Sequence, residues 1–271
     1  RIIELLLITT IPTMVVAAGA WPGAWLMVVT FVGGALAAGG ANAINMYVDR
    51  DIDALMERTK TRPLVTGLIS PRNALIFAIS LEIIAFAILW AGANFLSACL
   101  ALSATLFYVF VYSLWLKRTS KQNIVIGGAA GAVPVLVGWA AVTNSLAWTP
   151  WLLFLLIFLW TPPHFWALAI KYKDDYAAAH IPMLPVVVSK THLLRQMWVY
   201  TIAMIASSVA LIVNAKLQNW AMALTVLLGL IFAAQLRGLD EKSESYEKTA
   251  GKIFQWSITY LSLLSVLLVV A

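Results

Sequence analysis

Long apolar stretches separated by short polar breaks cover almost the whole chain. At about 20 residues per membrane crossing, they predict nine transmembrane helices. The predicted helices cover roughly residues 2–20, 25–47, 72–92, 97–115, 123–142, 150–170, 196–214, 218–235 and 253–271. The apolar stretches are continuous rather than alternating, which argues against a transmembrane barrel. The pattern therefore indicates an all-α, polytopic membrane protein.

The composition supports this fold class. The 271 residues are 62% hydrophobic and 11% charged, whereas a soluble domain carries about 25% charged residues. These values exclude a soluble globular protein, a disordered chain and a disulfide-stapled secreted domain. The single cysteine, Cys99, cannot form an internal disulfide. We therefore expect an integral membrane protein embedded in a lipid bilayer.

The charged residues gather on one predicted side of the membrane. All but one of the 18 Lys and Arg precede the first span or fall in the second, fourth, sixth and eighth connections, and Lys216 is the exception. The positive-inside rule makes that side cytoplasmic. The net charge of +6 thus reflects topology, not nucleic-acid binding. The other side carries tryptophans that fit an interfacial aromatic belt: Trp21, Trp25, Trp148, Trp151 and Trp220.

Two acidic residues do not follow this sorting. Glu4 lies near the start of the first span and Glu82 in the middle of the third. An intramembrane carboxylate is costly, so each is a candidate functional residue. We favour the structural alternative, a protonated or paired side chain, because neither lies near the polar motifs below.

The second span ends in a regularly spaced polar motif. Asn45, Asp49 and Asp53 are four residues apart, so they share one face of a helix. Stacked like charges are unfavourable unless a cation lies among them, and these oxygen ligands suit Mg²⁺. Asp51 points away from this face. A solvated helix end would explain the charge but not the spacing.

Basic residues lie close to these carboxylates along the chain. The connection after the second span contains Arg58, Lys60 and Arg62, and the fourth connection contains Lys117 and Arg118. Carboxylates for a metal beside cations for oxyanions suggest a metal–diphosphate site. The chain contains no Walker loop. Taken singly, each basic residue is equally well explained as an orientation signal.

A second polar motif follows the sixth span at a fixed offset from the first. Asp49 plus 126 is Asp175 and Asn45 plus 126 is Lys171, whereas Asp53 plus 126 is Ala179. Four spans separate the motifs, so both emerge on one side. We predict two four-helix halves, 1–122 and 123–235, and a final helix, 236–271, with a site between the halves. Asp175 would complete a metal site begun by Asp49 and Asp53.

The fifth and sixth spans contain further special positions. In the fifth, Gly127, Gly128 and Gly131 favour close helix packing over any binding role. The sixth contains Pro162-Pro163-His164 between Trp160 and Trp166. The prolines mark a kink or a cavity. A neutral imidazole can bind haem iron, and the tryptophans could line a flat apolar ligand. A satisfied core histidine is the alternative.

Together these motifs resemble the UbiA superfamily of intramembrane prenyltransferases. Asn45-x3-Asp49-x3-Asp53 is shared across that superfamily. A narrower resemblance, to the protohaem IX farnesyltransferases or haem O synthases, rests on Asp49-Arg-Asp-Ile-Asp53 and four further segments: Arg58-Thr59 with Arg62-Pro63-Leu64, Asn123 to Gly128, Trp160 to Ala169, and Asp175-Tyr176 with Ile181 to Pro185. It extends from Arg1 to about Tyr200. Because such proteins usually begin with a basic, proline-containing stretch, it also leads us to expect residues upstream of Arg1.

The resemblance implies Mg²⁺-dependent transfer of a farnesyl group from farnesyl diphosphate to a vinyl group of haem B, through an allylic cation. Asp49, Asp53 and Asp175, with Asn45, would hold Mg²⁺ on the diphosphate. Four basic residues would stabilise the departing charge: Arg58, Arg62, Lys117 and Lys171. His164, Trp160 and Trp166 would contact haem.

The resemblance also implies a location in a bacterial-type inner membrane, with the site towards the cytoplasm. A haem A synthase or terminal oxidase assembly factors would be its partners. Two other functions stay open from the sequence: prenyl transfer to an aromatic quinone precursor, and membrane transport. The Pro-Pro-His segment argues against the first. The parallel repeat and the one-sided polar groups argue against the second.

Overall fold

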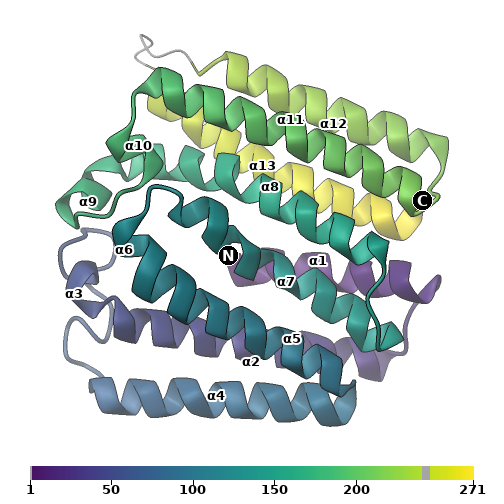
Figure 1. The fold of residues 1–271 in the computed structure, drawn as a ribbon, viewed down its shortest axis with the longest axis horizontal. Coiled ribbons are helices and arrows are strands. Elements are labelled where there is room, and N and C mark those ends of the chain that lie inside the picture. The colour runs from purple at the N-terminus through teal and green to yellow at the C-terminus, as the bar shows by residue number, and fades with distance from the viewer. Residues whose placement is uncertain (1, 240–244) are drawn as a thin grey trace.

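The computed structural model describes residues 2–239 and 245–271, with side chains from Ile8 onwards, and the regular secondary structure of these residues is entirely helical (Figure 1). The helices are α1 (Ile2–Ala18), α2 (Ala24–Val48), α3 (Arg50–Asp53), α4 (Pro71–Gly92), α5 (Phe95–Leu106), the π-helix η1 (Phe107–Leu116), α6 (Lys117–Thr119), α7 (Asn123–Thr143), α8 (Trp148–Lys171), α9 (Lys173–Ala178), α10 (Leu184–Val187), α11 (Lys190–Asn214), α12 (Asn219–Arg237) and α13 (Tyr246–Val270).

The predicted all-α, polytopic fold class is confirmed. In the described residues, α5, η1 and α6 form one segment, and eight helical segments are long and apolar enough to span a membrane. The remaining predicted span, 2–20, corresponds to the shorter α1. Two predicted starts were wrong, because α11 begins at Lys190 rather than 196 and α13 at Tyr246 rather than 253. Hydropathy marks where an apolar stretch begins, whereas the polar first turns of these helices already have helical backbone.

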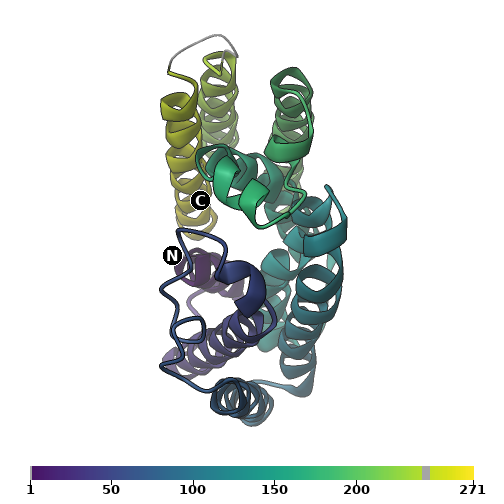
Figure 2. The same ribbon diagram turned by 90° about the vertical axis from the view of Figure 1, so that its left-hand side faces the viewer.

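The short helices α3, α6, α9 and α10 all lie at one end of the bundle (Figure 1). They belong to the second, fourth and sixth connections, so the predicted grouping of these polar segments is correct. Figure 2, which looks onto this end, shows α3 and the loop after it facing α9 and α10. The five tryptophans assigned to the aromatic belt are all exposed, by 44% to 78%, as expected for side chains at a membrane surface.

Helices α7 and α8 form the centre of the bundle. Helix α7 packs against α1, α5 and α8, and α8 also packs against α11 and α13. Helix α4 packs mainly on α2. Helix α7, from the second predicted half, therefore lies directly against α1 and α5 of the first.

Glu82 is buried between α2 and α4 and has a partner. Its Oε1 accepts a hydrogen bond of 3.1 Å from the Thr105 hydroxyl. Helix α2 comes close here because residue 40 is glycine, whose added Cβ would lie 2.6 Å from Glu82 Oε1. This geometry fits the structural interpretation of Glu82. The side chain of Glu4 lies outside the described residues.

Candidate active site

The first polar motif forms a buried network at the end of α2. The Asn45 amide Nδ2 donates to Asp49 Oδ2 at 2.6 Å and to the Ser113 hydroxyl at 3.0 Å. Lys117 Nζ forms an ion pair with the same Asp49 oxygen. Asp49 has no exposed surface. The network joins residues 68 positions apart and brings the predicted Asn45, Asp49 and Lys117 together.

Asp53 and Asp51 have different cationic partners. Arg62 NH1 lies 2.5 Å from Asp53 Oδ2, and the Asp53 side chain is 3% exposed. Asp51 points outward, as predicted, with a side chain that is 60% exposed. Arg118 donates to both Asp51 oxygens at 2.7 Å, and these hydrogen bonds lower the pKa of Asp51 to about 2. Arg118 also lies 3.6 Å from Asp49 Oδ1.

The second polar motif meets the loop of the first. Asp175 in α9 accepts hydrogen bonds of 3.3 Å from the backbone N–H groups of Glu57 and Arg58. Lys171 and Arg58 lie 5.6 and 5.4 Å from the ring of Tyr172, within cation–π range. All five residues line a shallow pocket at this end of the bundle. The second motif thus lies against the loop that follows the first, and Asp175 contacts the backbone of that loop rather than Asp49 or Asp53.

The predicted metal ligands do not form one compact cluster. Within the described residues, no group of three or more His, Cys, Asp or Glu side chains is placed to hold a metal. Two oxygens nevertheless fit a cation. Asp49 Oδ1 is buried and accepts no hydrogen bond, and Asn45 uses only its Nδ2 in the bonds above. Asp49 Oδ1 lies 3.6 Å from Arg118 without accepting a hydrogen bond, so a bound magnesium ion would supply the partner that it lacks.

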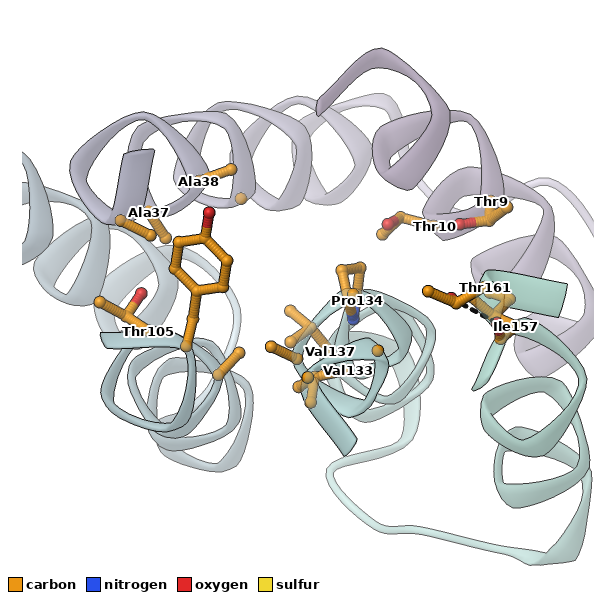
Figure 3. A pocket seen from close by; sticks show the side chains of 18 of the residues that line it. Thr9, Thr10, Ala37, Ala38, Thr105, Val133, Pro134, Val137, Ile157 and Thr161 are labelled. Carbon is orange, nitrogen blue, oxygen red and sulfur yellow. Dashed lines mark hydrogen bonds between the residues drawn. The ribbon is translucent and has the colours of Figure 1, made fainter. Parts of the chain in front are cut away.

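A largely apolar chamber lies inside the bundle beside this network. It has a volume of about 230 Å³ and is lined by α1, α2, α5, η1, α7, α8 and α13. In Figure 3, Pro134 and Val137 of α7 stand between Ala37 and Thr105 on one side and Thr10 on the other. Tyr108 and Tyr112, whose rings stack at 5.3 Å, line the chamber as well.

His164 lies in the chamber wall within a cluster of aromatic rings. Its ring stacks on Trp160 at 4.1 Å and on Phe254 of α13 at 4.7 Å. Its Nδ1 lies 2.6 Å from the Ser257 hydroxyl, and Trp160 donates to the Ser257 carbonyl at 2.8 Å. The side chain of His164 is nearly buried, and both His164 and Trp160 line the chamber. The structure therefore joins these two predicted residues.

Trp166 and the glycines of α7 are placed differently relative to the chamber. Trp166 does not line the chamber, because it is two positions beyond His164 and points to another side of α8, where its ring contacts Tyr200 at 5.5 Å. This placement gives no support for a haem contact. The glycines of α7 do allow close packing, since Gly127 lies against Tyr112 and Gly128 against Thr161. They also line the chamber.

Several residues at the site were not predicted from the sequence. They are Ser113, Tyr108, Tyr112, Tyr172, Phe254 and Ser257. Tyr108 and Tyr112 are four residues apart, which is the one sequence signal among them, since it places both on one helix face. The others meet the site only through tertiary packing.

Known proteins resemble this chain closely in sequence. The model of the UbiA prenyltransferase family matches residues 6–258. A protein from Kineococcus radiotolerans named protoheme IX farnesyltransferase is 52% identical, with 98% of this chain and 83% of that protein covered. One of the same name from Frankia alni is 49% identical, with 100% and 94% covered.

Solved structures share the fold. A digeranylgeranylglyceryl phosphate synthase aligns with a TM-score of 0.78 at 18% identity, over 98% of this chain and 92% of its own. A UbiA homologue from Archaeoglobus fulgidus, solved with GPP and Mg²⁺, aligns with a TM-score of 0.70 at 18% identity, over 97% and 96%. At this identity the likeness concerns the fold alone.

Proposed function

The chain belongs to the UbiA prenyltransferase family, and from this premise we propose that it transfers a farnesyl group from farnesyl diphosphate to a vinyl group of haem B, giving haem O. The relatives named protoheme IX farnesyltransferase support this choice of substrates. The observation that carries the proposal is the buried carboxylate–cation network beside an apolar chamber whose wall contains His164.

The charged end of the bundle suits a diphosphate. Lys117 and Arg62 pair with Asp49 and Asp53, and Arg58 and Lys171 line the adjoining pocket. These cations can stabilise the charge that develops on a leaving diphosphate. Asn45, Asp49, Asp53 and Asp175 are the proposed ligands of Mg²⁺, which neutralises diphosphate oxygens when bound. The solved relative with GPP and Mg²⁺ supports this proposal.

The chamber suits the carbon chemistry. When the C1–O bond of farnesyl diphosphate breaks, the diphosphate leaves with the electron pair and an allylic cation remains. The vinyl π electrons of haem then form the new C–C bond, and water adds to the resulting cation with loss of a proton. Apolar and aromatic walls exclude most water until that last step. No covalent intermediate on the protein is required.

His164 and Trp160 are the proposed haem contacts. They share the chamber with Tyr108 and Tyr112, which line its other side towards η1. This arrangement separates a histidine-bearing wall from the wall nearest to Lys117. We propose that haem lies against the wall that contains His164 and that the prenyl chain lies against the wall nearest to Lys117. His164→Ala should then weaken haem binding more than farnesyl diphosphate binding, and equal losses would contradict a haem role.

We also propose that the protein lies in a bacterial-type inner membrane with the charged end towards the cytoplasm, as the distribution of Lys and Arg favours. A haem A synthase or terminal oxidase assembly factors would receive the product. In a chain whose Cys99 is replaced by Ala, a cysteine placed at the exposed Lys121 should react with a membrane-impermeant maleimide only in inside-out vesicles. Reaction in right-side-out vesicles would show that the protein has the opposite orientation.

Substrate competition tests the function. Purified protein with Mg²⁺ is incubated with haem B or 4-hydroxybenzoate, and with isoprenyl diphosphates of several lengths. Mass spectrometry should show a hydroxyethylfarnesyl haem together with released diphosphate. A prenylated benzoate with no haem product would favour the quinone-precursor function, and no diphosphate release with any acceptor would contradict prenyl transfer.

A further inference from the structure

The last helix, α13, contributes side chains that restrain His164. Phe254 and Trp160 both stack on the imidazole, at interplanar angles of 29° and 20°. Two rings cannot share one face of an imidazole at these distances, so they cover both faces. Only the ring edge can therefore meet a ligand in the chamber. An imidazole coordinates a metal edge-on, through the in-plane lone pair of a ring nitrogen.

The Ser257 hydroxyl determines which ring nitrogen carries that lone pair. Its Oγ donates to the Phe254 carbonyl at 2.6 Å and lies 2.6 Å from His164 Nδ1. A hydroxyl has a single proton. Because the Ser257 hydroxyl already uses this proton in its hydrogen bond to the Phe254 carbonyl, it can only accept from His164. His164 Nδ1 must therefore carry a proton and donate a hydrogen bond to Ser257 Oγ. Nε2 is then unprotonated, and it has no hydrogen-bond partner among the described residues.

We infer that Ser257 is a positioning residue that fixes the Nδ1–H tautomer of His164, so that Nε2 serves as an axial ligand to the iron of the haem substrate. This inference rests on the proposed function. Ligating histidines generally donate their second ring N–H to an acceptor, which holds the ring and raises its basicity. The Trp160 bond to the Ser257 carbonyl fixes the stacked ring to the same residue.

Two probes distinguish iron ligation from general binding: ferric haem B and iron-free protoporphyrin IX. The full chain is compared with Ser257→Ala, Ser257→Thr, His164→Ala and the control Ser265→Ala, which removes a buried hydroxyl elsewhere on α13. Absorption and EPR spectra report histidine ligation. Ser257→Ala should weaken ferric haem binding about 10- to 100-fold and alter the spectrum, whereas protoporphyrin IX binding should stay unchanged. Ser257→Thr keeps the hydroxyl and should restore the spectrum.

Other outcomes overturn the inference in distinguishable ways. If wild type shows a histidine spectrum that Ser257→Ala leaves intact, Ser257 does not position the ligand and the proposed function stands. If Ser257→Ala weakened the binding of ferric haem B and of protoporphyrin IX equally, Ser257 would have a structural role only. A spectrum that survives His164→Ala would exclude His164 as the ligand. If wild type binds neither probe, the haem substrate itself is wrong. Should Ser257→Ala fail to fold, Ser257→Cys, with its weaker hydrogen bond, should give a smaller shift in the same direction.

Discussion

The two polar segments occupy positions 126 residues apart in the chain, yet they are built differently. In the first, Asp49 and Asp53 are buried and each forms an ion pair, with Lys117 of α6 and with Arg62 of the following loop respectively. In the second, the partly buried Asp175 accepts only two backbone N–H groups at 3.3 Å. It forms no ion pair within the part of the chain that the structure describes.

This difference indicates unequal roles. Buried ion pairs hold charges where the loss of one partner leaves the other unpaired and desolvated. The first segment therefore keeps a charged network assembled before any ligand arrives. Before a ligand arrives, the Asp175 carboxylate instead holds the backbone of Arg58 and thereby the loop that carries it. A repeat can thus preserve the position of an aspartate while its chemistry changes.

The largest expected effect is at Asp49. Asp49→Asn keeps the size of the side chain but removes the charge that faces Lys117 and the proposed Mg²⁺. We expect haem O formation to fall about 10²- to 10³-fold, the cost of losing a central electrostatic group. Asp51→Asn, which removes the same charge at an exposed neighbour, is the control and should keep near-normal activity. If Asp49→Asn kept more than a tenth of wild-type activity, the charge of Asp49 would not be essential to the reaction.

Lys117→Met should affect stability as well as activity. Its loss leaves Asp49 buried without its closest cation, which costs about 3–5 kcal/mol when a buried pair is broken. We expect a clear fall in Tm and a raised KM for farnesyl diphosphate. The double variant Lys117→Met with Asp49→Leu should recover much of the stability, because it removes both charges, but none of the activity. If the double variant were less stable than Lys117→Met, the unpaired charge of Asp49 would not be the cause of the lost stability.

The sequence allowed much of this comparison to be predicted, and the limits have a physical cause. Hydropathy located the helices, and four-residue spacing predicted that Asn45 and Asp49 share a face. Sequence spacing could not show which of Arg58, Lys60 and Arg62 pairs with Asp53, because all three are cations on one loop. The structure pairs Lys60 with exposed Glu57 and Arg62 with Asp53. Ser257 was beyond sequence reasoning altogether, since it meets His164 across 93 residues.

Asp175→Ala should have a smaller effect than either substitution in the first segment. It removes two long hydrogen bonds to a loop and no ion pair, so Tm should change little. The loop that carries Arg58 loses its anchor, and we expect KM for farnesyl diphosphate to rise about tenfold, equivalent to about 1.4 kcal/mol. Glu247→Ala, an acidic residue at the start of α13, is the control. A drop in activity as large as that of Asp49→Asn would mean that the two segments contribute equally.

The smallest effect concerns the pH dependence of the Asp51–Arg118 pair. The hydrogen bonds from Arg118 lower the pKa of Asp51 from 3.8 to about 2 in the folded protein. A carboxyl group with a depressed folded-state pKa stabilises the fold above its unfolded pKa, and that contribution disappears as pH falls from about 4 to 2. Because the pair is exposed, the contribution is small, and Asp51→Asn should lower Tm only slightly at pH 7. The difference in Tm between wild type and Asp51→Asn, followed by thermal unfolding from pH 6 downwards, should narrow below pH 4. A difference that widens below pH 4 would contradict the ion pair, since the charge that Arg118 stabilises is then being lost.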